Sequence, residues 1–353
     1  MAALQGGGPL DWVGRQLRQL PPACQELMCT AAFLGASGDL ETLAAATHTS
    51  AEEVLSRLWP ALCDGKLVLL DENAAPSGAL PLGMLHDIVQ QAAHALVAPE
   101  EGVGRHAAIG RALRDAYASA NTLEAHLFEV VQQFNLASPE TLHEDEREPL
   151  RELNTRAARR ARANGAANAA LRLYEHASAQ LSPSAWEGDP QGTFELIRDM
   201  AEAAYLAARF DKLDQLLDDL DARSLSVLEA MQVAELRIQG LLARNRLGEA
   251  LELGQQALQR LNEPLQPLIP PNLWPQVPAE SALDLSLPSS AEADAALRLL
   301  VWLTPCAFIT SFEMYARVIL SMADLARRYP ASRLTPISYT NYGLTLCGVG
   351  RND

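Results

Sequence analysis

The residues best suited to do chemistry lie in the stretch MLHDIVQQAAHAL, residues 84–96, where His86 and Asp87 stand side by side. They lie at the start of a predicted amphipathic helix, beside its apolar stripe. A side chain there can bind a phosphate or a neighbouring domain as readily as water, because the first backbone N–H groups of a helix have no partner within it. The stripe consists of Leu85, Ile88, Val89, Ala92 and Leu96.

The sequence lacks the motifs of a nucleotide-binding or catalytic site. A phosphate-binding loop requires G-x-x-x-x-G-K-[ST] after a strand, because backbone N–H groups must surround the phosphates while a lysine balances their charge. The only Gly-Lys pair is Gly65-Lys66. It has Pro60 at the first glycine position and Leu67 where Ser or Thr is needed. There is also no G-x-S-x-G motif, no protein-kinase catalytic loop and no H-E-x-x-H motif. We therefore predict that this chain alone is not an enzyme and holds no cofactor.

The cysteines and histidines indicate neither a metal site nor a disulfide framework. The five cysteines are scattered, and none forms a Cys-x-x-Cys pair. All seven histidines precede residue 177, at spacings that suit no metal site. Reduced, buried thiols in a cytoplasmic protein are the plain interpretation. The cysteines are Cys24, Cys29, Cys63, Cys306 and Cys347.

The chain is predicted to be soluble and cytoplasmic, with no membrane partner. Its first residues, MAALQGGGPLDWVG, lack the basic and apolar regions of a signal peptide. The longest uncharged run, residues 299–312, is interrupted by Pro305. It is also shorter than the ~20 residues that a membrane-spanning helix needs.

Charge argues against nucleic acid as a partner. The chain has 44 Asp and Glu residues against 28 Lys and Arg residues, a net charge of −16, and an acidic surface repels phosphate. Residues 147–165 carry six arginines that could neutralise phosphates, but acidic residues lie alongside them and no aromatic residue is available for stacking. A solvated or domain-docking helix face is therefore predicted. The arginines are Arg147, Arg151, Arg156, Arg159, Arg160 and Arg162.

Residues 21–98 have the pattern of a winged helix, in which three helices precede a two-stranded wing. Proline opens the first helix, which ends at Gly35. Ser37 or Asp39 caps the second helix, and Thr49 or Ser50 caps the third. The wing is predicted from the strands KLVLLDE and ALPLGML around the loop NAAPSG. Two glutamates at the start of the third helix oppose phosphate, so the module is predicted to pack against protein rather than to read DNA.

Beyond residue 99 the pattern is helical and weakly repetitive. The segments LAARFDKLDQLLDDL (206–220) and LARNRLGEALELGQQAL (242–258) align with an offset of roughly 37 residues, close to the 34 of tetratricopeptide (TPR) hairpins. A third hairpin is predicted over residues 163–181, and each hairpin is expected to bury its apolar face on the next. The predicted fold class is mostly α, with a winged-helix module followed by an irregular TPR-like solenoid.

Several segments together resemble a large family of bacterial signalling proteins. Members of this family join a serine/threonine-kinase-like domain, an AAA-type (STAND-class) ATPase, a winged helix and helical repeats, often with sensor and histidine-kinase domains. The resemblance covers almost the whole chain, and its most specific part is the stretch around His86. The segments are PPACQELMCTAAFLGASGDLETLA, LWPALCDGKLVLL, MLHDIVQQAAHALV, LFEVVQQFN, ELNTRAARRARANGAANAALRLYEHASAQL, AAYLAARFDKLDQLLDDL and NYGLTLCGVG.

The resemblance implies a role for the two residues of the opening stretch. In STAND-class ATPases a winged-helix histidine bonds to the diphosphate of bound ADP and holds the protein closed. His86 matches that histidine, and Asp87 matches the acid commonly beside it. An imidazole donates a hydrogen bond to phosphate oxygen, more strongly when it is protonated, and loss of this contact could release the winged helix. The alternative is that His86 caps a strand or bonds a neighbouring carbonyl.

The resemblance also divides the chain. It implies a leader or the end of an ATPase lid at residues 1–20, the winged helix at 21–98, TPR-like repeats at 99–260, a Pro-rich connection at 261–290, and further, truncated repeats at 291–353. The chain is then expected to be an internal piece of a longer protein, with ATP or ADP and Mg²⁺ bound in the missing ATPase domain.

We predict that the chain is a non-catalytic regulatory and interaction region, which couples nucleotide state to two-component or serine/threonine-kinase output. Its expected partners are the adjacent ATPase and kinase domains, together with a peptide or protein bound on the helical repeats. Two alternatives stay open. The chain could be a free-standing TPR-like adaptor, or a fragment of a STAND-type transcriptional activator whose DNA-binding domain lies outside it.

Overall fold

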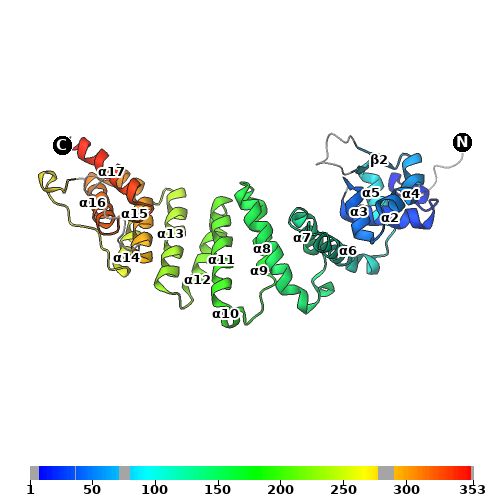
Figure 1. Cartoon of the computed structure of the whole chain (residues 1–353), viewed down its shortest axis with the longest axis horizontal. Coiled ribbons are helices and arrows are strands. Elements are labelled where there is room, and N and C mark those ends of the chain that lie inside the picture. The colour runs from blue at the N-terminus through cyan, green and yellow to red at the C-terminus, as the bar shows by residue number, and fades with distance from the viewer. Residues whose placement is uncertain (1–7, 36, 71–79, 277–289, 351–353) are drawn as a thin grey trace. The chain divides into compact units, whose positions relative to one another are not determined.

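The regular structure of the chain is mostly helical, as the sequence predicts. In the part of the chain that the structure describes there are seventeen α-helices and three short strands (Figure 1). The structure is a computed structural model that describes residues 8–35, 37–70, 80–276 and 290–350.

The chain divides into two compact units. The first comprises Met1–Arg160 with His176–Ser182, and the second comprises Ala161–Glu175 with Pro183–Asp353. The division falls within one helical hairpin, between residues 161 and 182. Each unit is described by itself below.

The first unit begins with short helices and strands and continues with longer helices. Its elements in chain order are α1 (Pro9–Leu17), α2 (Pro22–Leu34), β1 (Ser37–Asp39), α3 (Leu40–Thr47), α4 (Ala51–Cys63), β2 (Leu67–Leu69), β3 (Pro81–Met84), α5 (Asp87–His94), α6 (Pro99–Ser119), α7 (Leu127–Leu136), the short 3₁₀ turns Pro139–Thr141 and Glu144–Glu146, and most of α8 (Arg147–Ala163). The next helix, α9 (Ala167–Ser178), belongs mostly to the second unit.

Local capping chemistry sets the boundaries of the first helices. α2 ends at Gly35, as predicted. Asp39 caps α3, and its carboxylate accepts the N–H of Thr42 at 2.6 Å. Ser50 caps α4, and its hydroxyl accepts the N–H of Glu53 at 3.3 Å. Each cap satisfies a donor that the helix itself leaves unpaired, so the choice between the two candidate caps is resolved at both helices.

The small sheet has three strands rather than the two that the sequence indicates. β3 lies in the middle, antiparallel to both neighbours, with Gly38 opposite Leu82 and Val68 opposite Gly83. The additional strand β1 reads Ser-Gly-Asp, which has low strand propensity, so pairing with β3 holds it extended. The order α2–β1–α3–α4–β2–β3 is the element order of a winged helix. The predicted loop NAAPSG lies outside the described residues.

Helix α1 shares the core of this module. Val13, Leu17 and Leu20 are buried in the same cluster as Val89 and Ala92 of α5, and α1 packs directly on α5. The family resemblance assigns residues 1–20 to a leader or to the end of an ATPase lid. Within this chain, the described part of that segment closes the apolar face of α5.

The second unit is built from helical hairpins. α11 packs on α12, α13 on α14, and α15 on α16. Contacts of α13 with α11 and α15, and of α16 with α17, join the hairpins to one another. The remaining elements of the chain are α10 (Ala185–Gly188), α11 (Pro190–Leu206), α12 (Phe210–Asp221), α13 (Val227–Ala243), α14 (Leu247–Arg260), the 3₁₀ turn Pro271–Leu273, α15 (Ala291–Thr310), α16 (Phe312–Arg328) and α17 (Thr335–Gly348).

Successive hairpins turn in the same way, which confirms the helical repeat. Ala208 between α11 and α12 and Asn245 between α13 and α14 both have left-handed backbone, with φ of 55° and 58°, and Gly165 has φ of 75° between α8 and α9. The residue after Ala208 and the residue after Asn245 each donate their N–H to a carbonyl of the preceding helix. Arg209 donates to Ala204 at 2.8 Å, and Arg246 donates to Leu241 at 2.9 Å. These bonds satisfy carbonyls at the helix ends.

Helix α15 runs through Pro305, the proline that interrupts the longest uncharged run of the sequence. Proline removes one helix hydrogen bond, but Leu303, Cys306 and Ala307 are fully buried, and this packing holds the helix together. α15 is the one helix in the described ranges that is long and apolar enough to cross a membrane by length and composition. Half of its apolar window is buried inside the protein, and the core helix of a soluble protein passes the same test.

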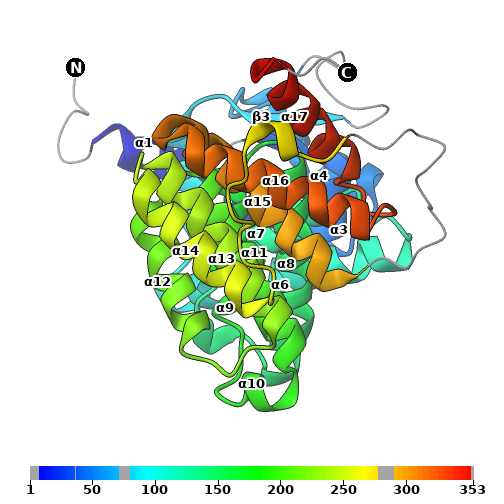
Figure 2. The same cartoon turned by 90° about the vertical axis from the view of Figure 1, so that its left-hand side faces the viewer.

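The described part of the Pro-rich connection is packed against helices. In Figure 2 it runs from the end of α14 past α15 and α16 to a short turn beside α17. Leu265 and Trp274 of this segment belong to the core cluster of the second unit.

Candidate functional site

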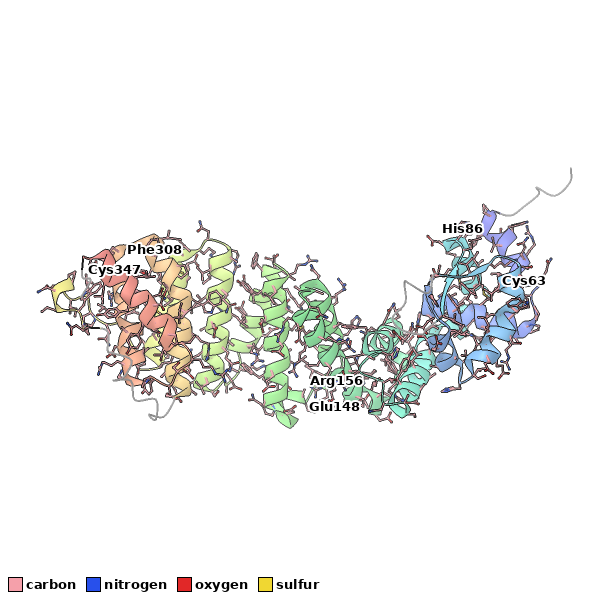
Figure 3. The ribbon with its side chains drawn as sticks, turned by 45° about the horizontal axis from the view of Figure 1, so that its top comes forward. Cys63, His86, Glu148, Arg156, Phe308 and Cys347 are labelled. Carbon is pink, nitrogen blue, oxygen red and sulfur yellow. The ribbon has the colours of Figure 1, made fainter. Side chains whose placement is uncertain are left out.

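His86 lies at the boundary between β3 and α5, on the surface of the first unit (Figure 3). It is the N-cap residue of α5, with extended backbone at φ −148° and ψ 150°. Its carbonyl accepts the N–H of Val89 at 2.8 Å, whereas its imidazole makes no capping hydrogen bond to α5. The ring is therefore held at a fixed point of the backbone and faces solvent.

Asp87 is the first residue of α5 and is also exposed. A carboxylate at a helix N-terminus is favoured by the positive end of the helix dipole. Leu85 is 49% exposed and precedes the helix, so its place on the predicted apolar stripe is wrong. The extended conformation of His86 delays the start of the helix and turns Leu85 away from the face that Val89 and Ala92 bury. The structure thus places His86 and Asp87 together, and the phosphate contact stays a prediction.

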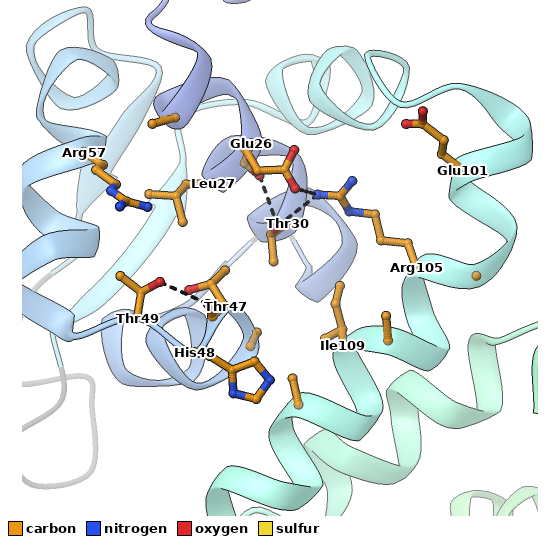
Figure 4. Close-up of a pocket in the computed structure, with 15 residues that line it drawn as sticks. Glu26, Leu27, Thr30, Thr47, His48, Thr49, Arg57, Glu101, Arg105 and Ile109 are labelled. Carbon is orange, nitrogen blue, oxygen red and sulfur yellow. Dashed lines mark hydrogen bonds and ion pairs between the residues drawn. The ribbon is translucent and has the colours of Figure 1, made fainter.

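A second candidate site is a cleft of about 600 Å³, which no sequence motif indicates. It lies between α2, the turn from α3 to α4, and α6 (Figure 4). Helix α6 contributes residues more than 40 positions away in sequence from the other walls, so only the tertiary fold brings these residues together. The polar lining residues are Glu26, Thr30, Thr47, His48, Thr49, Arg57, Glu101 and Arg105.

The charges of this cleft largely balance. Arg105 pairs with Glu26 and donates a hydrogen bond to the hydroxyl of Thr30 at 3.2 Å. Arg57 pairs with Glu53 one turn earlier in its own helix. Both guanidinium groups therefore already face a carboxylate, and the cleft is polar without being an anion site.

A partly buried polar cluster links α3, α6 and the start of α7. The hydroxyl of Tyr117 donates to the carboxylate of Glu129 at 3.2 Å and lies 3.1 Å from the hydroxyl of Thr42. His126 contacts the same carboxylate at 3.1 Å, and its ring stacks on Tyr117 with centroids 4.0 Å apart. Burial raises the pKa of Tyr117. A neutral phenol held this way joins helices, and we assign it no catalytic role.

A charged groove of about 380 Å³ lies on the repeats, between α12, α13 and α14. Arg244 donates to both carboxylate oxygens of Asp214, at 2.6 and 2.9 Å, and these bonds lower the pKa of Asp214. Arg237 pairs with Asp218 and Asp221. The groove is therefore a network of ion pairs between consecutive hairpins.

The arginines of residues 147–165 also form ion pairs within the chain. Arg147 pairs with Glu144 at 2.8 Å, and Arg151 pairs with Glu148 three residues earlier. Arg160 donates to the carbonyl of Glu124 at 2.7 Å. These contacts agree with the predicted solvated or domain-docking face.

The cysteines are free, and their surroundings differ. Cys24, Cys29 and Cys306 are buried, and burial raises the pKa of each thiol. Cys63 and Cys347 are exposed, so the interpretation of all five as buried thiols is wrong for these two. Among the residues that the structure describes, no group of His, Cys, Asp and Glu side chains has the arrangement of a metal site.

Comparisons with known proteins add little to this geometry. No protein-family model and no curated protein matches the chain. One solved structure, a Signal Transduction ATPase with Numerous Domains (STAND) protein with a tetratricopeptide repeat sensor from Pyrococcus horikoshii, aligns at 10% sequence identity and a TM-score of 0.35. The alignment covers 98% of this chain and 51% of that protein, so the chain spans about half its length. A TM-score this low does not establish a common fold.

Proposed function

We propose that this chain is a non-catalytic regulatory and interaction region of a STAND-type signalling protein, in which it couples the nucleotide state of an ATPase domain to kinase output. The observation that carries the proposal is the exposed imidazole of His86, fixed at the N-cap of α5 without a bond to its own helix. It belongs to a module with the element order of a winged helix. The ligand, the diphosphate of ADP, is inferred from the sequence resemblance of this stretch to STAND-class proteins.

In the proposed closed state, an N–H of the His86 ring donates a hydrogen bond to a diphosphate oxygen of ADP. The positive end of the α5 dipole favours the same charge. A protonated ring strengthens the bond, because charge-assisted hydrogen bonds are roughly twice as strong as neutral ones. When the nucleotide changes, the contact is lost, and the module is free to move away from the ATPase domain.

The rest of the chain contributes binding rather than chemistry in this proposal. ATP or ADP with Mg²⁺ binds in the ATPase domain, and this chain itself needs no cofactor. The helical hairpins bind a peptide or protein partner, and the adjacent ATPase and kinase domains are the other partners. Nucleic acid and membrane are not partners, and the protein acts in the cytoplasm.

The test is an ADP titration by calorimetry on the polypeptide that carries both this chain and the ATPase domain. His86→Ala should weaken ADP binding at least tenfold, since a hydrogen bond to a charged group contributes about 1.5–3 kcal/mol, and it should raise basal output. Gln91→Ala is the control, because Gln91 is an exposed polar residue of the same helix. Unchanged ADP affinity in His86→Ala would show that His86 is a structural residue and that the coupling proposal is wrong.

A free-standing adaptor is the second candidate function, and exposed apolar side chains favour it. Phe308, Ile309 and Phe312, at the turn from α15 to α16, are 69%, 68% and 57% exposed (Figure 3 labels Phe308). Large exposed apolar side chains that lie together mark protein-binding surfaces. An adaptor would bind its partner with the same affinity in the presence and absence of ATP, whereas the STAND-type region would not.

A further inference from the structure

Residues 261–276, here called the strap, contain one short 3₁₀ turn and otherwise no regular structure, and they pack against helices of the second unit. Helix α14 ends at Arg260, and Asn262, with φ of 58°, turns the chain into the strap. Leu265 and Trp274 are its buried anchors, at 8% and 3% exposure. Leu268 and Leu273, between these anchors, are 44% and 62% exposed. Prolines fix φ and cannot continue a helix, so the strap loses little entropy when it is held extended.

Two side chains of α16 bind the backbone of one strap residue, Gln266. The hydroxyl of Ser321 accepts the Gln266 N–H at 2.8 Å, and Arg317 Nε donates to the Gln266 carbonyl at 3.1 Å. Ser321 is 4% exposed, and its own proton is donated to the carbonyl of Arg317 at 2.8 Å, which leaves its oxygen free to accept. Both contacts are made to main-chain atoms, so they suit any extended segment that has an N–H at this position.

The ends of the strap are held by an aromatic contact and an ion pair. The Trp274 ring stacks on Tyr342 of α17 with centroids 6.4 Å apart, and the Tyr342 hydroxyl donates to the Pro275 carbonyl. At the other end Glu263 accepts a hydrogen bond from Arg328 at 2.9 Å, and this bond raises the pKa of Arg328. Along the strap, the helices thus offer a cation, a donor and an acceptor for the backbone of one residue, and an aromatic surface. Aromatic surfaces that receive proline-rich, extended segments are a recurring mode of peptide recognition.

We propose that the surface of Arg317, Ser321 and Arg328 on α16 with Tyr342 on α17 is a recognition site for proline-rich peptides, and that the strap occupies it in cis as an exchangeable ligand. A partner segment with the same chemistry, an acidic residue followed by prolines and a tryptophan, binds when the strap leaves. The strap therefore inhibits partner binding. The inference rests on the proposed function only in that it names one kind of partner for the repeats.

The test measures binding of a fluorescein-labelled peptide, LNEPLQPLIPPNLWPQ, to the full 353-residue chain by fluorescence anisotropy. Gln266→Pro removes the N–H that Ser321 binds and should release the strap, whereas Gln266→Ala keeps that N–H and is the matched control. We expect the peptide to bind Gln266→Pro at least tenfold more tightly than the wild type or Gln266→Ala. Adding Ser321→Ala to Gln266→Pro should reverse most of this gain.

Equal peptide binding by a folded Gln266→Pro variant and Gln266→Ala would overturn the proposal, because the strap would then be a permanent part of the core. Circular dichroism establishes that each variant is folded. Hydrogen exchange on the unmodified chain provides a measurement that needs no variant. The amide of Gln266 should exchange through local opening, well before the amides of α15 and α16, and exchange at the same rate as those helices would also overturn the proposal. Neither experiment uses nucleotide, so their outcome is independent of the role of His86.

Discussion

Arg111 of α6 donates hydrogen bonds from two of its nitrogens to the carboxylate of Glu146, at 2.8 and 2.6 Å. A third bond runs from Arg111 to the carbonyl of Thr141 at 2.8 Å. The Glu146 side chain is only 9% exposed. The hydrogen bonds from Arg111 lower the pKa of Glu146 to about 2. This pair fixes the 3₁₀ turns before α8 to the middle of α6.

We predict that this pair makes the stability of the first unit depend on pH in the acid range. The pKa of Glu146 is about 2 in the folded state, against an ordinary value of 4.5 for a glutamate, so the stabilisation is complete above about pH 4.5. It is lost as the pH falls towards 2, and its size is on the order of 3 kcal/mol. In urea unfolding at a series of pH values, Glu146→Gln should be less stable than the wild type at pH 7, and the difference should shrink below pH 4.5. Glu100→Gln, at an exposed position of α6, is the control, and the same pH profile in both variants would contradict the prediction.

Gly254 allows α14 to approach α15 closely. A Cβ at this position would lie 2.5 Å from the methyl carbons of Leu303, which is fully buried. Gly254→Ala should therefore destabilise the second unit by about 1–3 kcal/mol, as overpacking of a core does. Gly248→Ala lies in the same helix with no atom within 4 Å of the added Cβ, and it should stabilise by about 0.5–1 kcal/mol through helix propensity. Urea unfolding of both variants checks the pair, and a destabilised Gly248→Ala would mean that packing at Gly254 is not the cause.

Ala208 occupies the left-handed position in the turn between α11 and α12, with φ of 55°. A residue with a Cβ is strained there by about 1–2 kcal/mol, whereas glycine is not. Ala208→Gly should therefore raise the free energy of unfolding by about 0.5–1 kcal/mol, after the larger chain entropy of glycine is subtracted. Ala207→Gly is the matched control. Its φ of −83° needs no glycine, so this variant should be destabilised. A loss of stability in Ala208→Gly would show that the turn is not strained.

Arg244 and Asp214 connect two consecutive hairpins through a two-bond ion pair. A double-mutant cycle with Arg244→Met and Asp214→Asn should give a coupling energy of about 1 kcal/mol. The cycle with Arg246→Met and Glu249→Gln, an exposed pair within one turn of α14, should give a smaller coupling energy that salt reduces further. Equal coupling energies in the two cycles would mean that the groove ion pairs do not join the hairpins.

The features that sequence predicts well are those set by neighbours in the chain. Asp39, Ser50 and Gly35 act within one turn of their helices, so their roles can be recognised locally. β1 could not be predicted in this way, because its three residues become a strand only by pairing with β3, more than forty positions later.

The candidate sites were less predictable for the same reason. His86 is recognisable because its position depends on one strand and one helix, but its exposure and the late start of the helix at Asp87 had to be seen in the structure. The cleft depends on α6 crossing α2, and the contact of Trp274 with Tyr342 joins residues far apart in sequence. Periodicity carries no information about which surfaces meet when connections differ in length.

The packing of α1 on α5 sets a practical limit on how the protein can be shortened. A version starting at Pro21 would lack α1, which covers Val89 and Ala92. Apolar side chains of the first unit would then be exposed to water. We expect the truncated protein to aggregate during purification. Expression of the intact amino-terminal unit therefore needs to begin before Pro9.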